Sequence, residues 1–260
     1  MATRSAPRHQ TVAERVALAT EAAQRGDDET AHGIWVELGH AGLARAQAEI
    51  GRAFVQGPGI EHAVDLALKW LTPAAQDGDA LAQRLLGDFY FNGEDGTPNR
   101  MVAEEWYARA AKNGEAHAQD MLSWMLVDSD HRQPDHKQAM HWALKAAAQG
   151  VAASMTRIGL LYNNALGVER DLDAAAQWWR KAALLGDADG QAMLGAAHLI
   201  GAGVARDPVV ALAWLIRGRR GHSPFADRFY AGVRASCTAD EIAQAERRAA
   251  LPLEAEEALP

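Results

Sequence analysis

Large apolar residues recur along this chain with a long and constant period. Tryptophans stand 36 residues apart at five positions, which are Trp70, Trp106, Trp142, Trp178 and Trp214. Glycines keep the same step at Gly42, Gly78, Gly114, Gly150 and Gly186. A fixed period in this range is the signature of stacked structural repeats. The pattern therefore predicts a solenoid, in which each repeat buries its apolar face against its neighbours.

The spacing within one period predicts two helices. In residues 152–186, Ile158 and Tyr162 stand four residues apart and indicate a first helix over about 152–164. Asp171 occupies an N-cap position and starts a second helix over about 172–185. Trp178 lies on the apolar side of that helix, and Gly186 is expected to end it in the left-handed conformation.

The other copies follow the same order of residues. The first helix carries glycine at Gly51, Gly87, Gly159 and Gly195, with Ser123 replacing it once. The N-cap position holds Asn99, Asp135, Asp171 and Asp207, with Ala63 in the first copy. Five copies thus span about 43–222. The periodic tryptophans are expected to be core, and Trp106→Ala should cost roughly 3–5 kcal/mol of stability, measurable by melting.

The two ends are predicted to cap the repeats. Residues 1–42 form an N-terminal cap with a helix over about 11–25 and a degenerate first repeat. Residues 223–260 form capping helices over about 224–235 and 239–250, the second opened by a capping box that starts at Thr238. The acidic tail from Pro252 is expected to be frayed.

This arrangement resembles the Sel-one-like repeat family, a branch of the tetratricopeptide-like helical repeats. The resemblance rests on the Ile/Leu-Gly pairs with a following Tyr or Phe, the turn from Gly201 to Val204, the Asp cap, and the Ala-x-x-Trp and Ala-Ala-x-x-Gly patterns. It implies an all-α fold, a right-handed superhelical α/α solenoid of about five to six 36-residue helix-turn-helix repeats with helical caps. It also implies a role as an adaptor or scaffold, and no catalytic residue.

Composition narrows the choice of partner and compartment. The net charge is −8 and the pI about 5.7, which argues against nucleic acid as a partner. No apolar run approaches the roughly 20 residues of a membrane helix, so we expect no membrane insertion. Cys237 is the single cysteine, which rules out an intrachain disulfide and favours a cytoplasmic location.

No motif for catalysis or cofactor binding is present. The sequence lacks a nucleophile elbow, a Walker loop, a dinucleotide fingerprint and a zinc motif, so we expect neither an enzyme nor a cofactor. The stretch from Asp128 to His136 is rich in possible metal ligands, but their spacing matches no recognised site, and a solvated loop is favoured. Cys237 has no context that marks a nucleophile.

A partner is expected on the concave side. In tetratricopeptide-like stacks the first helix of each hairpin lines that side, and by this analogy seven residues are candidates: Arg84, Asp88, Phe91, Asp120, Trp124, Leu160 and Asn163. Trp124 is out of phase with the periodic tryptophans and could anchor a partner. Alternatively, Trp124 packs between repeats and compensates for the missing glycine at Ser123.

These observations favour a non-enzymatic adaptor that binds another protein or a peptide segment. The alternatives are an enzyme or small-molecule binder that uses the groove, and an assembly factor that acts through its convex face or ends. The basic cluster from Arg217 to His222 could receive an acidic partner or complement a helix C-terminus. Trp124→Ala and Asp120→Arg are expected to weaken partner capture and leave melting nearly unchanged. The third repeat should be the least stable.

Overall fold

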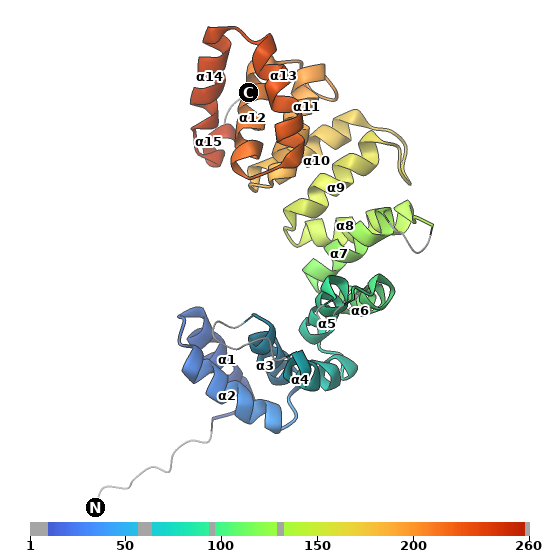
Figure 1. Ribbon diagram of the computed structural model, residues 1–260, viewed down its shortest axis with the longest axis vertical. Coiled ribbons are helices and arrows are strands. Elements are labelled where there is room, and N and C mark those ends of the chain that lie inside the picture. Colours follow the sequence, from blue (N-terminus) through green and yellow to red (C-terminus); the bar gives the residue numbers. More distant parts are fainter. Residues whose placement is uncertain (1–9, 57–63, 94–96, 129–132, 258–260) are drawn as a thin grey trace, which may run out of the picture. The chain divides into compact units, whose positions relative to one another are not determined.

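The structure, a computed structural model, describes residues 10–56, 64–93, 97–128 and 133–257 (Figure 1). Among these residues the regular elements are fifteen α-helices, and no strand occurs, which confirms the all-α class. The chain divides into two compact units, one up to Ala118 and one from Gln119. The boundary lies inside α7 (Ala116–Val127). The predicted division into caps and repeats at 42 and 222 stays a prediction.

The first unit is a series of helices in which each packs against the next. The helices are α1 (Val12–Gln24), α2 (Asp28–His40), α3 (Ala44–Gln56), α4 (Val64–Gln76), α5 (Ala80–Asn92) and α6 (Arg100–Lys112). Trp35, Leu38 and Ile50 belong to one buried cluster, and Leu71 and Leu85 to the next. The hairpins α3–α4 and α5–α6 are therefore the first two of the predicted repeats, preceded by the hairpin α1–α2.

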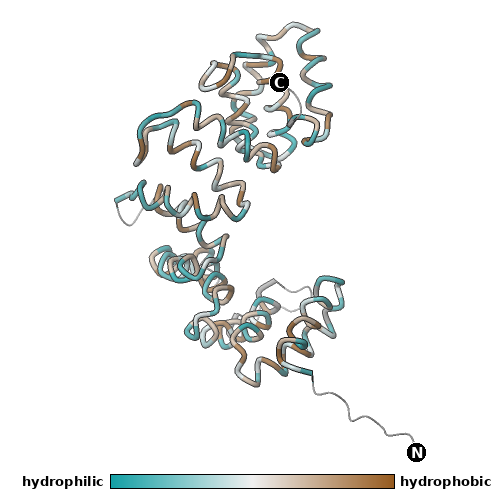
Figure 2. Tube along the Cα trace, turned by 180° about the vertical axis from the view of Figure 1, so that it is seen from behind, coloured by the Kyte–Doolittle hydropathy of each residue, from teal (hydrophilic) through white to brown (hydrophobic). Residues whose placement is uncertain are grey.

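The second unit continues the hairpins from α7. Its other helices are α8 (His136–Ala148), α9 (Ala152–Asn163), α10 (Leu172–Leu184), α11 (Ala188–Ile200), α12 (Pro208–Arg220), α13 (Pro224–Ser236), α14 (Ala239–Ala249) and α15 (Leu253–Glu257). Hydrophobic and hydrophilic residues are interspersed along the helices (Figure 2). The predicted helices at 11–25, 224–235 and 239–250 are confirmed within one residue at each end.

Polar caps and glycines set the helix ends where the sequence predicts them. Asn99, Asp135, Asp171 and Asp207 each accept a hydrogen bond from a backbone N–H in the first turn of the helix that follows. The periodic glycines have φ angles between +85° and +92°, a region that favours glycine because it has no Cβ. Ala63 lies outside the described residues. The repeat length is thus fixed by caps as well as by the core.

The periodic tryptophans are buried to different degrees. Trp142 and Trp214 have 9% and 4% of their surface exposed, whereas the other three are half-buried. A basic side chain three residues later lies over the ring in four copies, at 4.3 to 5.0 Å from a ring centroid: Arg109, Lys145, Lys181 and Arg217. The rings therefore combine core packing with a cation–π contact. The core packing was predicted from the sequence, and the cation–π contact was not.

The glycine of each first helix gives space to a large side chain of the second helix. A Cβ on Gly87 would lie 2.6 Å from the Tyr107 ring, and one on Gly159 would lie 2.3 Å from the Trp179 indole. The Trp179 indole N–H also donates to the carbonyl of Thr156 at 3.2 Å. These two glycines have ordinary helical φ angles, unlike the glycines that end the helices. Glycine is therefore required here because a Cβ would collide with the neighbouring ring.

The third repeat changes both members of this pair. Ser123 takes the glycine position, and Ala143 takes the position of Tyr107 and Trp179. The Ser123 hydroxyl donates to the carbonyl of Ala139 at 2.8 Å and is fully buried. The small side chain of Ala143 thus leaves room for Ser123 at the glycine position.

The acidic tail is ordered, and the prediction that it frays was wrong for residues 253–257. They form α15, whose Glu256 is only 3% exposed and forms ion pairs with Arg217 and Arg248. Arg217 also donates to the carbonyls of Arg248 and Leu251. Part of the basic cluster predicted near Arg217 is therefore bound within the chain, by its own C-terminal segment.

Candidate functional site

Two of the predicted site residues in the first unit bind each other. Arg84 forms an ion pair with Asp88, and its Nε lies 3.4 Å from a carboxylate oxygen of Glu115. Asp88 accepts a hydrogen bond of 2.8 Å from the hydroxyl of Tyr107. Burial, followed by the charge of Asp88, raises the pKa of Tyr107, so the phenol stays protonated and donates. These charges hold α5 to α6, while Phe91 near the end of α5 is half-buried.

Asp120 lies inside the second unit. It is 7% exposed, pairs with the guanidinium of Arg157 and accepts a hydrogen bond from the Ser154 hydroxyl. These bonds join α7 to α9. The expectation that Asp120→Arg leaves melting unchanged does not fit this position, because the substitution would place a second buried cation next to Arg157.

Trp124 and Leu160, predicted from the sequence as site residues, line one groove of the second unit. Its volume is about 330 Å³, within the range of ligand-binding pockets. The lining comes from α7, α9, the start of α11, the start of α13 and two of their turns: Trp124, Val127, Asp128, Ala153, Thr156, Arg157, Leu160, Leu161, Asn164, Leu166, Asp187, Asp189 and Phe225. Asn163 is not among them. It donates to the side chain of Asn164 instead.

The lining positions repeat with the period of the chain. Trp124 and Leu160 are 36 residues apart, and so are Asp128 and Asn164. A third set runs through Ala153, Asp189 and Phe225 at the same interval. Equivalent faces of α7, α9, α11 and α13 thus form one continuous surface, and α13 acts as the first helix of a further hairpin.

The floor of the groove is apolar, and three of its polar lining residues are acidic: Asp128, Asp187 and Asp189. Trp124, Val127 and Leu160 are half-buried, and Phe225 is 40% exposed. Asp187 accepts hydrogen bonds from the Thr156 hydroxyl and the N–H of Gly190, both at 2.7 Å. Asp189 accepts one from the Ser223 hydroxyl at 2.6 Å, and Asp128 is exposed. Arg157 is the basic residue of the lining, and it is paired with Asp120.

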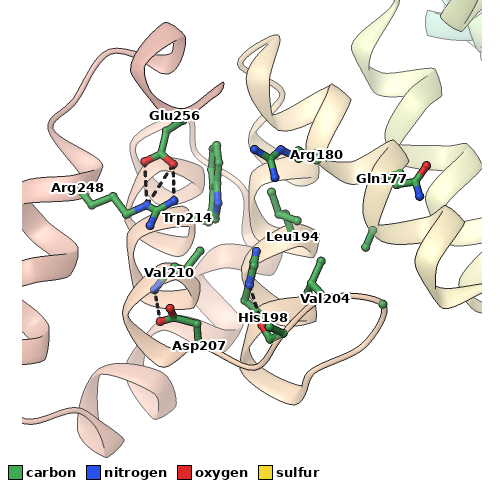
Figure 3. Close-up of a pocket in the computed structure, with 13 residues that line it drawn as sticks. Gln177, Arg180, Leu194, His198, Val204, Asp207, Val210, Trp214, Arg248 and Glu256 are labelled. Carbon is green, nitrogen blue, oxygen red and sulfur yellow. Dashed lines mark hydrogen bonds and ion pairs between the residues drawn. The ribbon is translucent and has the colours of Figure 1, made fainter. Parts of the chain in front are cut away.

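A second pocket, of about 360 Å³, lies beside α15 (Figure 3). Its apolar wall includes Leu194, Val204 and Trp214, and Figure 3 shows Glu256 and Arg248 next to the Trp214 ring. This pocket was not predicted from the sequence, because the residues after Pro252 were expected to be frayed. Since α15 forms part of its wall, the pocket exists only while that short helix is docked.

His198 lines the second pocket and is held by its backbone surroundings. Its Nδ1 lies 3.1 Å from the carbonyl oxygen of Ala205. Burial lowers the pKa of His198, and the charges of Arg248 and Arg180 lower it further, against the hydrogen bond to Ala205. The imidazole is therefore neutral at neutral pH, and Nδ1 carries the proton.

The candidate metal and thiol positions offer little chemistry. The described residues contain no group of three or more His, Cys, Asp or Glu side chains that could hold a metal ion. Most of the loop between Asp128 and His136 lies outside the described residues. Burial, followed by the charge of Glu241, raises the pKa of the Cys237 thiol, which disfavours the reactive thiolate.

None of the described helices combines the length and hydrophobicity that a bilayer crossing requires.

The sequence pattern of the Sel1 repeat matches five consecutive segments, residues 44–79, 80–115, 116–151, 152–187 and 188–220. Together they cover more than half of the chain. This chain is a Sel1 repeat protein. The predicted family is confirmed, and the matched segments follow the hairpins from α3–α4 to α11–α12. No curated protein matches the chain.

Solved Sel1 repeat structures share the fold. A Sel1 repeat protein from Oxalobacter formigenes is 25% identical, with a TM-score of 0.79 over 90% of this chain and 96% of that one. A protective antigen of uropathogenic Escherichia coli strains, which displays an SLR fold, is 23% identical, with a TM-score of 0.61 over 92% of this chain and 60% of that one. A putative sel1 repeat protein from Klebsiella pneumoniae is 18% identical, with a TM-score of 0.50 over 78% and 99% of the chains.

The acidic and aromatic rim of the groove was missed by sequence reasoning. Asp189 and Phe225 lie one helical turn before the positions that were considered on the Sel1 first helices. They are in the 36-residue register of Ala153, so the signal was present in the sequence. Following the period beyond residue 222 would have found Phe225.

Proposed function

We propose that this Sel1 repeat protein is a non-enzymatic adaptor that binds a segment of another protein in the groove of its second unit. The observation that carries the proposal is the apolar floor formed by Trp124, Val127 and Leu160 with the exposed Phe225. Sel1 repeats are typically protein-interaction scaffolds. Fully burying one large apolar side chain is worth about 1.5–3 kcal/mol, so two partly exposed aromatics can supply substantial affinity.

The architecture supports binding rather than catalysis. The groove is lined by equivalent positions of successive first helices, whose side chains differ while the frame is constant. Such a surface recognises an extended segment by its sequence of side chains. Phe91, on a first helix of the first unit, was also predicted to bind a partner, and that binding remains part of this proposal. The cytoplasmic location expected from the single cysteine is part of this proposal as well.

The test compares partner capture by four versions of the immobilised protein. Trp124→Ala and Phe225→Ala remove the two aromatic contacts, and Ile200→Ala serves as a control because Ile200 is exposed and lies outside the groove lining. Proteins from the native organism should be retained by the wild type and the control, and lost with either aromatic variant. Melting curves check that all four are folded.

The alternatives predict different results. If both aromatic variants retain the same proteins as the wild type, the groove is not the binding site. The convex face, the ends and the pocket beside α15 would then become the candidates. A small-molecule binder using the groove would retain no protein in any version.

A further inference from the structure

We infer that the segment bound in this groove carries lysine or arginine next to a large apolar side chain. The inference rests on the proposed function, because it specifies the chemistry of the partner at the same site. It follows from the combination of an apolar floor with carboxylates that have no cationic partner of their own in the described structure.

The apolar floor defines where a side chain would insert. Trp124 and Leu160 come from α7 and α9, and Phe225 lines the same groove from α13. The three residues lie on helices that the core holds in place, so the floor is preformed. A leucine or aromatic side chain of the partner would lose its contact with water there. An acidic surface without this floor would bind basic segments with or without a large apolar side chain.

Three carboxylates from two parts of the chain line the groove beside this floor. Asp187 and Asp189 are at the start of α11, and Asp128 follows α7. Asp187 and Asp189 accept hydrogen bonds from hydroxyls and, for Asp187, from a backbone N–H. Such bonds orient a carboxylate without removing its negative charge. Among the described residues no basic side chain forms an ion pair with these three carboxylates. The one guanidinium in the lining, that of Arg157, is already paired with Asp120.

This charge distribution selects among partners. A cation on the segment would find an opposite charge on several sides, while an acidic segment would be repelled from the same positions. The chain carries a net charge of −8, so the long-range field acts in the same direction. Basic residues should therefore raise the association rate, and the effect should weaken with added salt.

The size of the groove indicates a short segment. The first helices that line the groove contact one another in the order α7, α9, α11 and α13. Helices in contact lie about 8–10 Å apart, so the three steps from α7 to α13 correspond to about 24–30 Å. An extended chain advances about 3.3–3.6 Å per residue, so about seven to nine residues span the groove. One apolar side chain with a basic residue on either side fits this length.

The first experiment is a selection from a displayed library of random short peptides. Wild type and Trp124→Ala are used in parallel, with Phe225→Ala as a second aromatic variant. The expected result is enrichment by the wild type of peptides that combine lysine or arginine with a leucine or aromatic residue, and loss of these peptides with either variant.

The second experiment tests the charges with matched peptides. Three synthetic peptides keep the apolar positions of the selected sequence and carry lysine, glutamine or glutamate at its basic positions. The double variant Asp128→Asn with Asp189→Asn retains hydrogen-bond acceptors and removes two charges. Each exposed ion pair is worth about 1.5- to 5-fold, so the lysine peptide should bind the double variant about 2- to 25-fold more weakly. The control Asp173→Asn removes an exposed carboxylate outside the groove lining and should have no effect.

The outcomes separate the inference from the proposed function. If the wild type enriches neutral or acidic peptides, or if the lysine and glutamine peptides bind equally, the inference is overturned and the binding groove stands. If neither aromatic variant changes the selection, both the groove and the inference fall. Weakening by the Asn substitutions for the lysine peptide alone supports both.

Discussion

The side chain opposite each first-helix glycine decides whether that position can carry a Cβ. At Gly159 the opposing residue is Trp179, and at Gly87 it is Tyr107. In the third repeat the opposing residue is Ala143, and Ser123 is accommodated. The two positions therefore act as a pair, and the pair should respond to substitution in a coupled way.

A double-mutant cycle measures this coupling. Gly159→Ser should cost about 1–3 kcal/mol by overpacking against the indole, and under about 1 kcal/mol when Trp179 is already alanine. Trp179→Ala alone should cost about 3–5 kcal/mol. Urea unfolding of the four proteins gives the coupling. Gly232→Ala is the control, since nothing lies within 4 Å of that Cβ position, and it should stabilise α13 by about 0.5–1 kcal/mol. An equal cost of Gly159→Ser in both backgrounds would contradict the pairing.

His198 should make stability depend on pH. Its pKa is lowered in the folded state, mainly by burial, so the unfolded imidazole binds its proton at a higher pH than the folded one. The contribution of the neutral ring is complete above the unfolded pKa of about 6.5, and stability is lost as the pH falls from there through the folded pKa.

The melting temperature between pH values of about 7 and 5 tests this sign. It should fall more steeply for the wild type than for His198→Tyr, which places at this position the residue that Tyr162 provides in the preceding repeat. His141→Gln, at an exposed histidine, should keep the wild-type slope. If the His198→Tyr protein loses stability with acid as steeply as the wild type, the half-buried imidazole of His198 is not the cause.

Among the elements, α15 depends most on contacts with other helices. A helix of five residues is not stable alone in water, so docking must hold it. Glu256 supplies the charge between Arg217 and Arg248. Arg217 is 7% exposed, and its Nε and Nη1 have no hydrogen-bond partner among the described residues. Its Nη2 donates to the carbonyls of Arg248 and Leu251, and Glu256 is the carboxylate that pairs with its charge.

Glu256→Gln should therefore release α15 while the core of α12 remains folded. Hydrogen exchange at 253–257 should approach the rate of an unfolded chain, and Trp214 fluorescence should shift to the red as the indole becomes exposed to water. The melting temperature should fall only slightly, because detachment of α15 lets Arg217 and Arg248 regain water. Glu254→Gln, at an exposed position of the same helix, should leave exchange unchanged. Undisturbed protection in the Glu256 variant would show that the ion pairs do not hold the helix.

On the scale of the whole molecule, the period determined most of what could be predicted. Each helix of the five repeats follows from a cap such as Asp171, a glycine such as Gly186 and an apolar phase such as that of Trp178. These signals are local, and each recurs in several repeats. A helix boundary that is ambiguous in one repeat can therefore be placed from the others. For Trp124 the phase left two possibilities, the groove or packing between repeats, and in the structure it is half-buried and lines the groove.

Contacts between segments far apart in the sequence could not be predicted in this way. Asp120 looked like a rim residue because its partners, Ser154 and Arg157, lie 34 and 37 residues further along. Glu256 looked like part of a polar tail because Arg217 lies 39 residues before it. A charged residue is assigned to solvent by its type, and only the packing of neighbouring repeats shows that its charge is used internally.

The distribution of stability along the second unit gives the last prediction. The third repeat holds Ser123 and Ala143 where the fourth holds Gly159 and Trp179, so its hairpin buries less apolar surface at this position. Stability in stacked repeats is a sum of local and nearest-neighbour terms. Amides of 119–148 should therefore exchange faster than those of 152–184, as hydrogen exchange at each amide can show.

A paired substitution tests the cause of this difference. Ala143→Leu alone should destabilise the third hairpin, because the larger side chain meets the Cβ and hydroxyl of Ser123. Ala143→Leu together with Ser123→Gly recreates the combination of Gly51 with Leu71 and of Gly195 with Leu215, in which a glycine makes room for leucine. The double variant should exchange more slowly over 119–148 than the single variant and than the wild type. If the glycine does not rescue the leucine, packing at this position is not what weakens the third repeat.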